Sequence, residues 1–76
     1  MPKLPRITGG EAVRAFKRAG FEEDRTNGSH TILKKTGHLY HLSIPVHAGK
    51  TIGKGLLKAQ IEAAGLTVEQ FIDLLK

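Results

Sequence analysis

A histidine that directly follows a tight polar turn is the residue of this sequence best suited to chemistry. The turn is Asn27-Gly28-Ser29, and His30 stands between it and the apolar pair Ile32-Leu33. The ordinary pKa of histidine lies near neutrality, so its ring both accepts and donates protons at the pH of a cell. We therefore consider His30 as a general acid and base, and packing of its ring beside Ile32 as the structural alternative.

RNA cleavage is a reaction that such a histidine can carry out. Attack by the ribose 2′-hydroxyl requires one proton to leave that hydroxyl and another to reach the departing 5′-oxygen, while cations stabilise the phosphate. Gly28 and Ser29 would place turn N–H groups and a hydroxyl near this phosphate. We predict acid–base cleavage of RNA with His30 as the catalytic residue, without a metal or another cofactor.

The charge of the chain favours a polyanionic partner. Its 76 residues contain 12 Lys and Arg against seven Asp and Glu, which gives a net charge of +5. Nucleic acid is the first candidate for such a surface, and an acidic protein partner or simple solubility are the alternatives. A membrane partner is disfavoured because no segment combines a wide apolar face with a concentrated basic face.

Several basic residues are candidates for contacts with the RNA backbone. Lys34 and Lys35 belong to an expected strand, with Arg25 across the hairpin. His47 is a candidate second proton-transfer group or phosphate contact, although packing of its loop also explains it. The segment from Lys50 to Lys54 leads into a helix N-terminus, where free N–H groups bind phosphate, or is a solvated loop. The predicted RNA-binding residues are Arg25, Gly28, Ser29, Lys34, Lys35, His47, Lys50 and Lys54.

Metal sites and base-stacking sites are both disfavoured by the sequence. His38, His41 and His47 match no common zinc-ligand spacing, and the chain contains no cysteine. All four aromatic residues fit the pattern of a hydrophobic core, so no stacking platform for single-stranded bases is predicted. These residues are Phe16, Phe21, Tyr40 and Phe71.

A small α+β fold is needed to position these candidates. The capping box Thr8-Gly9-Gly10-Glu11 follows an N-terminal arm, residues 1–7, and predicts a helix to about residue 19. Hairpin and alternation signals predict three antiparallel strands, and two further helices follow. The expected strands are residues 21–26, 30–35 and 39–44, and the expected later helices are residues 55–64 and a short one from residue 68.

This order of elements, α-β-β-β-α with a short extra C-terminal helix, predicts a three-stranded antiparallel sheet with helices on one face. The arrangement is double-stranded-RNA-binding-like. Strand alternation places His30 on the same face as Ile32. If that face is the buried one, the site lies at the end of the sheet.

The length of the chain predicts one domain. The lack of cysteine and of an N-terminal apolar stretch predicts a cytoplasmic location with no membrane span.

Several segments, taken in order, resemble the HicA family of small toxins, the mRNA-cleaving partners of HicB antitoxins. They are residues 4–11, 17–21, Gly28-Ser29-His30, 44–47 and 64–71. The resemblance implies a single HicA-like domain over residues 1–76, with a double-stranded-RNA-binding-like fold. It also implies a type II toxin that is a metal-independent endoribonuclease, with the catalytic role on His30 and with Gly28 and Ser29 shaping the site. The implied partners are mRNA and a HicB-like antitoxin that blocks the active surface. A non-catalytic RNA-binding module of the same fold, or a module that binds only an acidic protein, are the alternatives.

Overall fold

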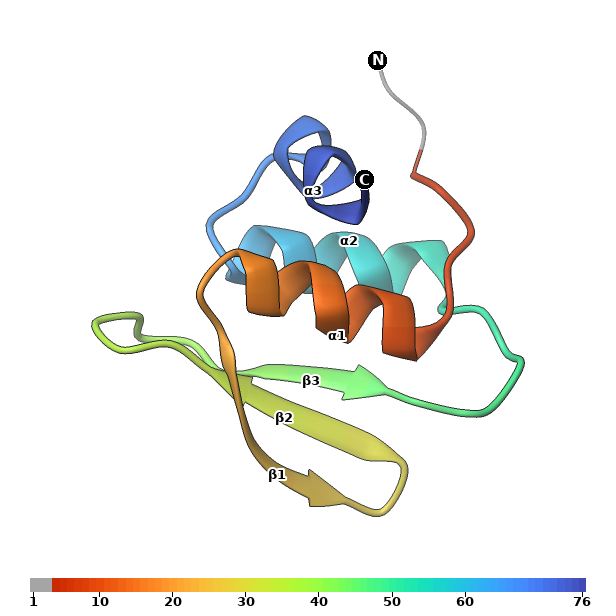
Figure 1. Cartoon of the computed structure of the whole chain (residues 1–76), viewed down its shortest axis with the longest axis horizontal. Coiled ribbons are helices and arrows are strands. Elements are labelled where there is room, and N and C mark those ends of the chain that lie inside the picture. The colour runs from red at the N-terminus through yellow and green to blue at the C-terminus, as the bar shows by residue number, and fades with distance from the viewer. Residues whose placement is uncertain (1–3) are drawn as a thin grey trace.

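Three helices and three strands make up residues 4–76, the part of the chain that this computed structural model describes. The first three residues of the expected N-terminal arm lie outside this part. In chain order, the elements are α1 (Gly9–Arg18), β1 (Glu22–Asn27), β2 (His30–Lys34), β3 (Leu42–Pro45), α2 (Lys54–Ala63) and α3 (Val68–Leu75) (Figure 1). This order confirms the predicted α+β fold. Within the described residues, no helix is long and apolar enough to cross a membrane.

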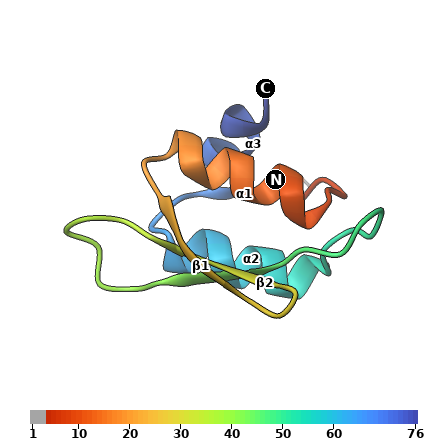
Figure 2. The same ribbon diagram turned by 60° about the horizontal axis from the view of Figure 1, so that its bottom comes forward.

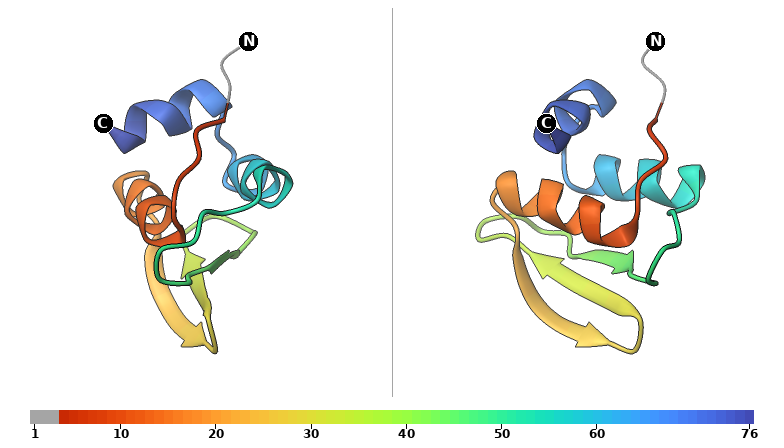
Figure 3. Two further views of the ribbon diagram at one scale, coloured as in Figure 1. Left: turned by 90° about the vertical axis from the view of Figure 1, so that its right-hand side faces the viewer. Right: turned by 45° about the vertical axis from the view of Figure 1, so that its right-hand side comes forward.

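The elements form three layers, with the sheet on one side of the molecule. The strands are antiparallel in the order β1-β2-β3, and α1 and α2 lie side by side on one face of this sheet (Figures 1 and 3). α3 lies over the two helices on the side away from the sheet (Figure 3). The largest fully buried side chains come from all three layers: Phe16, Leu33, Leu42, Ile44, Leu57, Ile61 and Phe71.

The alternation of buried residues along β2 shows which face of the sheet the helices cover. Thr31 and Leu33 are buried, whereas His30 and Lys34 are exposed and Ile32 is half-buried. Because successive strand residues point to opposite faces, His30, Ile32 and Lys34 lie on the face that carries no helix. Ile32 therefore does not mark the buried face, and His30 belongs to the open face of the sheet.

β1 is an edge strand whose six residues are all exposed. It spans Glu22–Asn27 rather than the predicted 21–26, because Phe21 is buried in the core before the strand begins. Its register with β2 shifts between Glu23 and Arg25, so Asp24 sits at a bulge. Charged residues and a bulge protect the open edge of a sheet from pairing with other chains.

β3 is shorter than the sequence predicted, and Tyr40 is not a core residue. The strand begins at Leu42 rather than at residue 39, and Tyr40 is 60% exposed. The cause is His38, whose Nε2 donates a hydrogen bond to the Ala63 carbonyl at the end of α2, 2.6 Å away. The His38 ring also packs edge-on against Phe21. These contacts hold the chain outside the sheet until Leu42.

Two of the three helices begin with the predicted capping boxes. The Thr8 hydroxyl accepts the Glu11 N–H, and the Glu11 carboxylate accepts the Thr8 N–H in return. The hydrogen bonds from the Thr8 backbone and hydroxyl lower the pKa of Glu11 from its ordinary value of 4.5. Thr67 and Gln70 form the same arrangement at α3. Both helix starts are therefore determined locally.

The start of α1 lies directly against the chain that leaves β3. A Cβ atom added to Gly9 would overlap the Pro45 carbonyl oxygen and lie 2.9 Å from the Val46 Cα. These are backbone atoms, which have little freedom to move aside. Gly9 is therefore required because of its size, and it fixes the distance between α1 and the end of β3.

We expect Gly9→Ala to destabilise the protein by about 1–3 kcal/mol, because its methyl group overpacks this contact. Gly10→Ala is the matched control, since its Cβ would meet only the Thr8 hydroxyl oxygen, at 4.0 Å. Alanine at that position should be neutral or slightly stabilising, by up to about 1 kcal/mol. Urea unfolding of both variants measures the difference, and equal stabilities would contradict the close approach.

Candidate active site and nucleic-acid surface

His30 is the first residue of β2 and is exposed on the helix-free face of the sheet. It stands opposite Asn27 in β1 and opposite Pro45 in β3. Directly opposed residues of antiparallel strands point to the same face, so Asn27 shares the surroundings of His30. The sequence predicts Asn27 as a turn residue, whereas in the structure it is the last residue of β1, and the two-residue turn Gly28-Ser29 connects it to His30.

The turn before His30 is tied to the segment that follows β3. Gly28 has a φ of +63°, which fits a two-residue hairpin turn with glycine at its first central position. Ser29 is half-buried, and its carbonyl accepts the Val46 N–H at 2.6 Å. This hydrogen bond places the segment that contains His47 at the same end of the sheet as His30.

The segment after Val46 is held against the N-terminal arm. The His47 carbonyl accepts the Lys50 N–H at 3.0 Å, and both residues are exposed. Thr51 forms an isolated β-bridge with Thr8 at the start of α1. The segment is therefore a positioned loop that presents His47 and Lys50 to solvent near the turn.

Lys54 lies on the other side of the sheet from the His30 side chain. It is the first residue of α2, which covers the opposite face (Figure 1). Among the described residues, no side chain accepts a hydrogen bond at the N-cap of α2, Gly53. The first N–H groups of a helix are unsatisfied within the helix and attract anions. A phosphate bound near Lys54 would belong to a nucleic-acid strand that passes around this end of the protein.

Two of the remaining basic candidates, Lys34 and Lys35, lie away from this end, whereas Arg25 stands opposite Ile32 on the face that carries His30. Lys34 is four residues along β2 from His30, roughly 13 Å at the usual strand rise. Its ammonium is 3.3 Å from Asp24, whose carboxylate also lies 3.8 Å from the Arg25 guanidinium. Lys35 places its ammonium 5.7 Å from the centre of the Phe21 ring. The structure therefore groups His47 and Lys50 with His30, and places Lys34 and Lys35 near the opposite end.

Positive charge is concentrated in the segment that builds this surface. Residues 25–61 contain no Asp or Glu, yet they contain all four histidines of the chain. They form most of the hairpin, β3, both long loops and nearly all of α2. A continuous segment whose charged residues are all basic attracts a polyanion, and the binding of that polyanion depends on salt.

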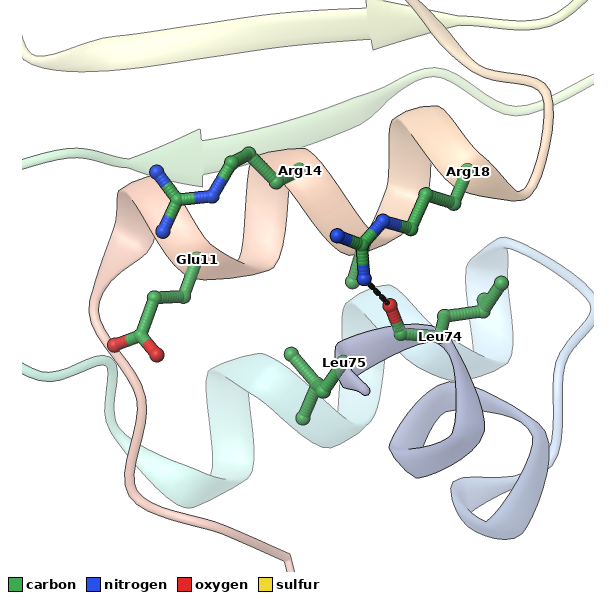
Figure 4. A pocket seen from close by; sticks show the side chains of 6 residues that line it. Glu11, Arg14, Arg18, Leu74 and Leu75 are labelled. Atoms are coloured by element: carbon green, nitrogen blue, oxygen red, sulfur yellow. Dashed lines mark hydrogen bonds between the residues drawn. The ribbon is translucent and has the colours of Figure 1, made fainter.

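A pocket of about 160 Å³ lies elsewhere, between α1 and the C-terminal end of α3 (Figure 4). Arg18 crosses this junction and donates hydrogen bonds to the carbonyls of Leu74, at 2.7 Å, and Lys76, at 2.8 Å. Arg18 therefore fastens α3 to α1. None of the residues that line the pocket is a candidate site residue. The pocket is lined by Glu11, Arg14, Ala15, Arg18, Leu74 and Leu75.

The histidines are distributed among different roles in the structure. His38 is occupied by its hydrogen bond to the Ala63 carbonyl, whereas His30, His41 and His47 are exposed. Within residues 4–76, no three side chains of His, Asp or Glu lie close enough together to hold a metal ion.

Comparison with known proteins gives one finding that bears on this geometry. A family model described as "HicA toxin of bacterial toxin-antitoxin" matches residues 9–66, which is more than half of the chain. The matched range begins with α1, ends just after α2, and includes the complete sheet with His30 and His47. Among curated proteins, none matches the chain.

Proposed function

Because the chain belongs to the HicA toxin family of bacterial toxin–antitoxin systems, we propose that it is an endoribonuclease that cleaves mRNA. Family membership makes the protein a toxin with an antitoxin partner. The observation that carries the proposed reaction is the placement of His30. Its ring is exposed on the helix-free face, after a tight turn and within a segment that contains no acidic residue.

His30 would transfer both protons of the cleavage reaction. As a base, its neutral ring takes the proton of the ribose 2′-hydroxyl, whose oxygen forms a bond to phosphorus. As an acid, the protonated ring returns a proton to the 5′-oxygen as the bond between that oxygen and phosphorus breaks. The products are a 2′,3′-cyclic phosphate and a free 5′-hydroxyl.

The groups around His30 supply the remaining requirements of this reaction. Backbone N–H groups of the turn and the Ser29 hydroxyl would bind the phosphate oxygens. Lys50 adds a positive charge at the same end of the sheet. His47 is the second candidate for one of the two proton transfers. Imidazole performs the acid–base steps here, so the proposed mechanism requires no metal.

The antitoxin is proposed to act on the same surface. A HicB-like protein that covers the helix-free face would exclude RNA from His30. The net charge of +5 favours an acidic antitoxin surface at this contact. The RNA and the antitoxin would then compete for one face of the sheet.

We expect the purified protein to cleave mRNA in the presence of EDTA and to leave 2′,3′-cyclic phosphate ends. RNA of the same sequence with 2′-O-methyl groups should remain intact, because it lacks the nucleophile. Gel electrophoresis and analysis of the product ends measure both outcomes. Binding that weakens steeply with salt but yields no products would instead support a non-catalytic RNA-binding module. The positive charge of residues 25–61, which contain no Asp or Glu, is sufficient to explain such binding.

A further inference from the structure

The loop between β2 and β3 extends beyond the sheet at the end opposite the hairpin turn (Figure 2). Two large side chains of this loop are exposed, Leu39 by 83% and Tyr40 by 60%, and we call these two residues the tip. An exposed tyrosine on a projecting loop has no role in the core. Tyr40 is therefore not a core residue, and unlike the three phenylalanines it is free to stack with a base.

Tyr40 is held in place although it is exposed. Its ring lies edge-on to the His38 ring, with the centroids 6.2 Å apart and an interplanar angle of 69°. His38 in turn packs against Phe21, at 5.4 Å, and bonds to the Ala63 carbonyl. A ring that is positioned before binding loses less conformational entropy when a ligand stacks on it.

The charge around this tip favours nucleic acid over a protein partner. Lys35 and His41 are exposed within a few residues of Tyr40, and no acidic residue occurs in the sequence between Arg25 and Ile61, although Lys34 pairs with Asp24. The residues that contribute most to a protein–protein interface are typically surrounded by residues that exclude water. Lysine is depleted in such interfaces. Aromatic rings combined with basic side chains are typical of surfaces that bind single-stranded nucleic acid.

We propose that Tyr40 is a platform on which a base of single-stranded RNA stacks. Because the proposal builds on the proposed ribonuclease function, the same RNA would extend from His30 along the sheet to this loop. The β2 strand alone separates the two ends by roughly 13 Å. At about 3.4 Å per stacked nucleotide, the RNA must cover about four nucleotides or more. Tyr40 would then position longer RNA and have no effect on a dinucleotide.

The chain offers a direct test, because Tyr40 is its only tyrosine and it contains no tryptophan. Tyrosine fluorescence therefore reports on this residue alone. The full chain carrying His30→Ala is titrated with a single-stranded RNA of about eight nucleotides, a length within the usual range of such sites. We expect the fluorescence to be quenched with the same Kd that fluorescence anisotropy of labelled RNA gives.

Substitutions at the tip complete the test. Added to His30→Ala, Tyr40→Ala should raise the Kd roughly 5- to 150-fold, the equivalent of losing one stacked base. Tyr40→Phe retains the ring and should stay within about 2-fold. Leu39→Ala, at the more exposed neighbour, is the matched control and should leave the Kd unchanged. Circular dichroism checks that each variant is folded.

Unquenched fluorescence together with an unchanged Kd for Tyr40→Ala would overturn the proposal. Weaker neutralisation by the antitoxin, with RNA affinity unchanged, would also overturn it and assign Tyr40 to the protein interface. Both readouts use RNA that is not cleaved. If the wild-type protein fails to cleave RNA while quenching persists, the proposed reaction falls and the stacking platform stands.

Discussion

Replacing His30 with alanine is expected to abolish RNA cleavage while leaving the folded structure intact. The variant loses the group proposed to perform the proton transfers, and general acid–base catalysis typically contributes about 10²–10⁴-fold to a rate. The His30 side chain is exposed, so its removal should change the free energy of unfolding by less than about 0.5 kcal/mol. Cleavage of mRNA in EDTA and thermal unfolding, measured on the same preparations, test the two parts.

Two other exposed histidines serve as controls for this result. His41→Ala should cleave a dinucleotide at the wild-type rate, because His41 lies outside the cluster around the turn. His47→Ala distinguishes the two forms of the mechanism. If His30 transfers both protons, the variant keeps most of the activity. If His47 provides one of them, the variant loses one limb of the bell-shaped pH–rate profile. Full activity in His30→Ala would remove this mechanism.

Features determined by neighbouring residues could be predicted from the sequence. The capping boxes at Thr8 and Thr67 and the hairpin turn at Gly28 lie where local chemistry places them. In each of them, the interacting groups are separated by only a few residues. The order of elements, and the position of His30 directly after the turn, followed from these features.

Features that depend on distant contacts could not be predicted in this way. The start of β3 and the exposure of Tyr40 follow from His38, which bonds to Ala63, 25 residues away in sequence. The face of the sheet that the helices cover could not be predicted, because β2 buries a threonine, Thr31, and leaves Ile32 half-buried. Hydrophobicity alone would place these two residues the other way round.

The positions and partners of the basic candidates also depend on contacts between distant residues. Arg25 stands opposite Ile32 in the register set by the turn, whereas the bulge at Asp24 shifts the pairing of Glu23 and Glu22. Asp24 lies near both Arg25 and Lys34. Their charges are therefore partly neutralised, an effect that spacing along the chain does not reveal. His47 reaches the His30 end because Pro45 pairs with His30 in the sheet and the Val46 N–H bonds to the Ser29 carbonyl.

α3 lies outside the range that the family model matches, yet its Phe71 is a central core residue. The ring is fully buried, and its centroid lies 4.9 Å from that of Phe16 in α1. We expect Phe71→Ala to cost about 3–5 kcal/mol, because it removes a large buried ring and leaves a cavity. A domain of this length has roughly 4–11 kcal/mol of stability in total. The variant should therefore be close to unfolding at physiological temperature.

Ile72→Ala, the adjacent position of α3, is the matched control. Its side chain is half-buried and lies outside the core cluster, so we expect a cost below about 1.5 kcal/mol. Urea unfolding followed by circular dichroism compares the two variants. Equal unfolding midpoints would show that α3 is not part of the cooperative core, although Arg18 bonds to its last carbonyls.

The loss of α3 packing should also disturb the candidate active site, because a continuous set of contacts connects the two. Phe71 packs on α1, α1 begins at Gly9 against Pro45 and Val46, and Val46 bonds to Ser29 beside His30. We therefore expect Phe71→Ala to cleave RNA poorly at 37 °C and to regain activity on cooling, as its folded fraction rises. His30→Ala should stay inactive at every temperature, because its defect is chemical. A Phe71→Ala protein that is folded but inactive at low temperature would contradict this distinction.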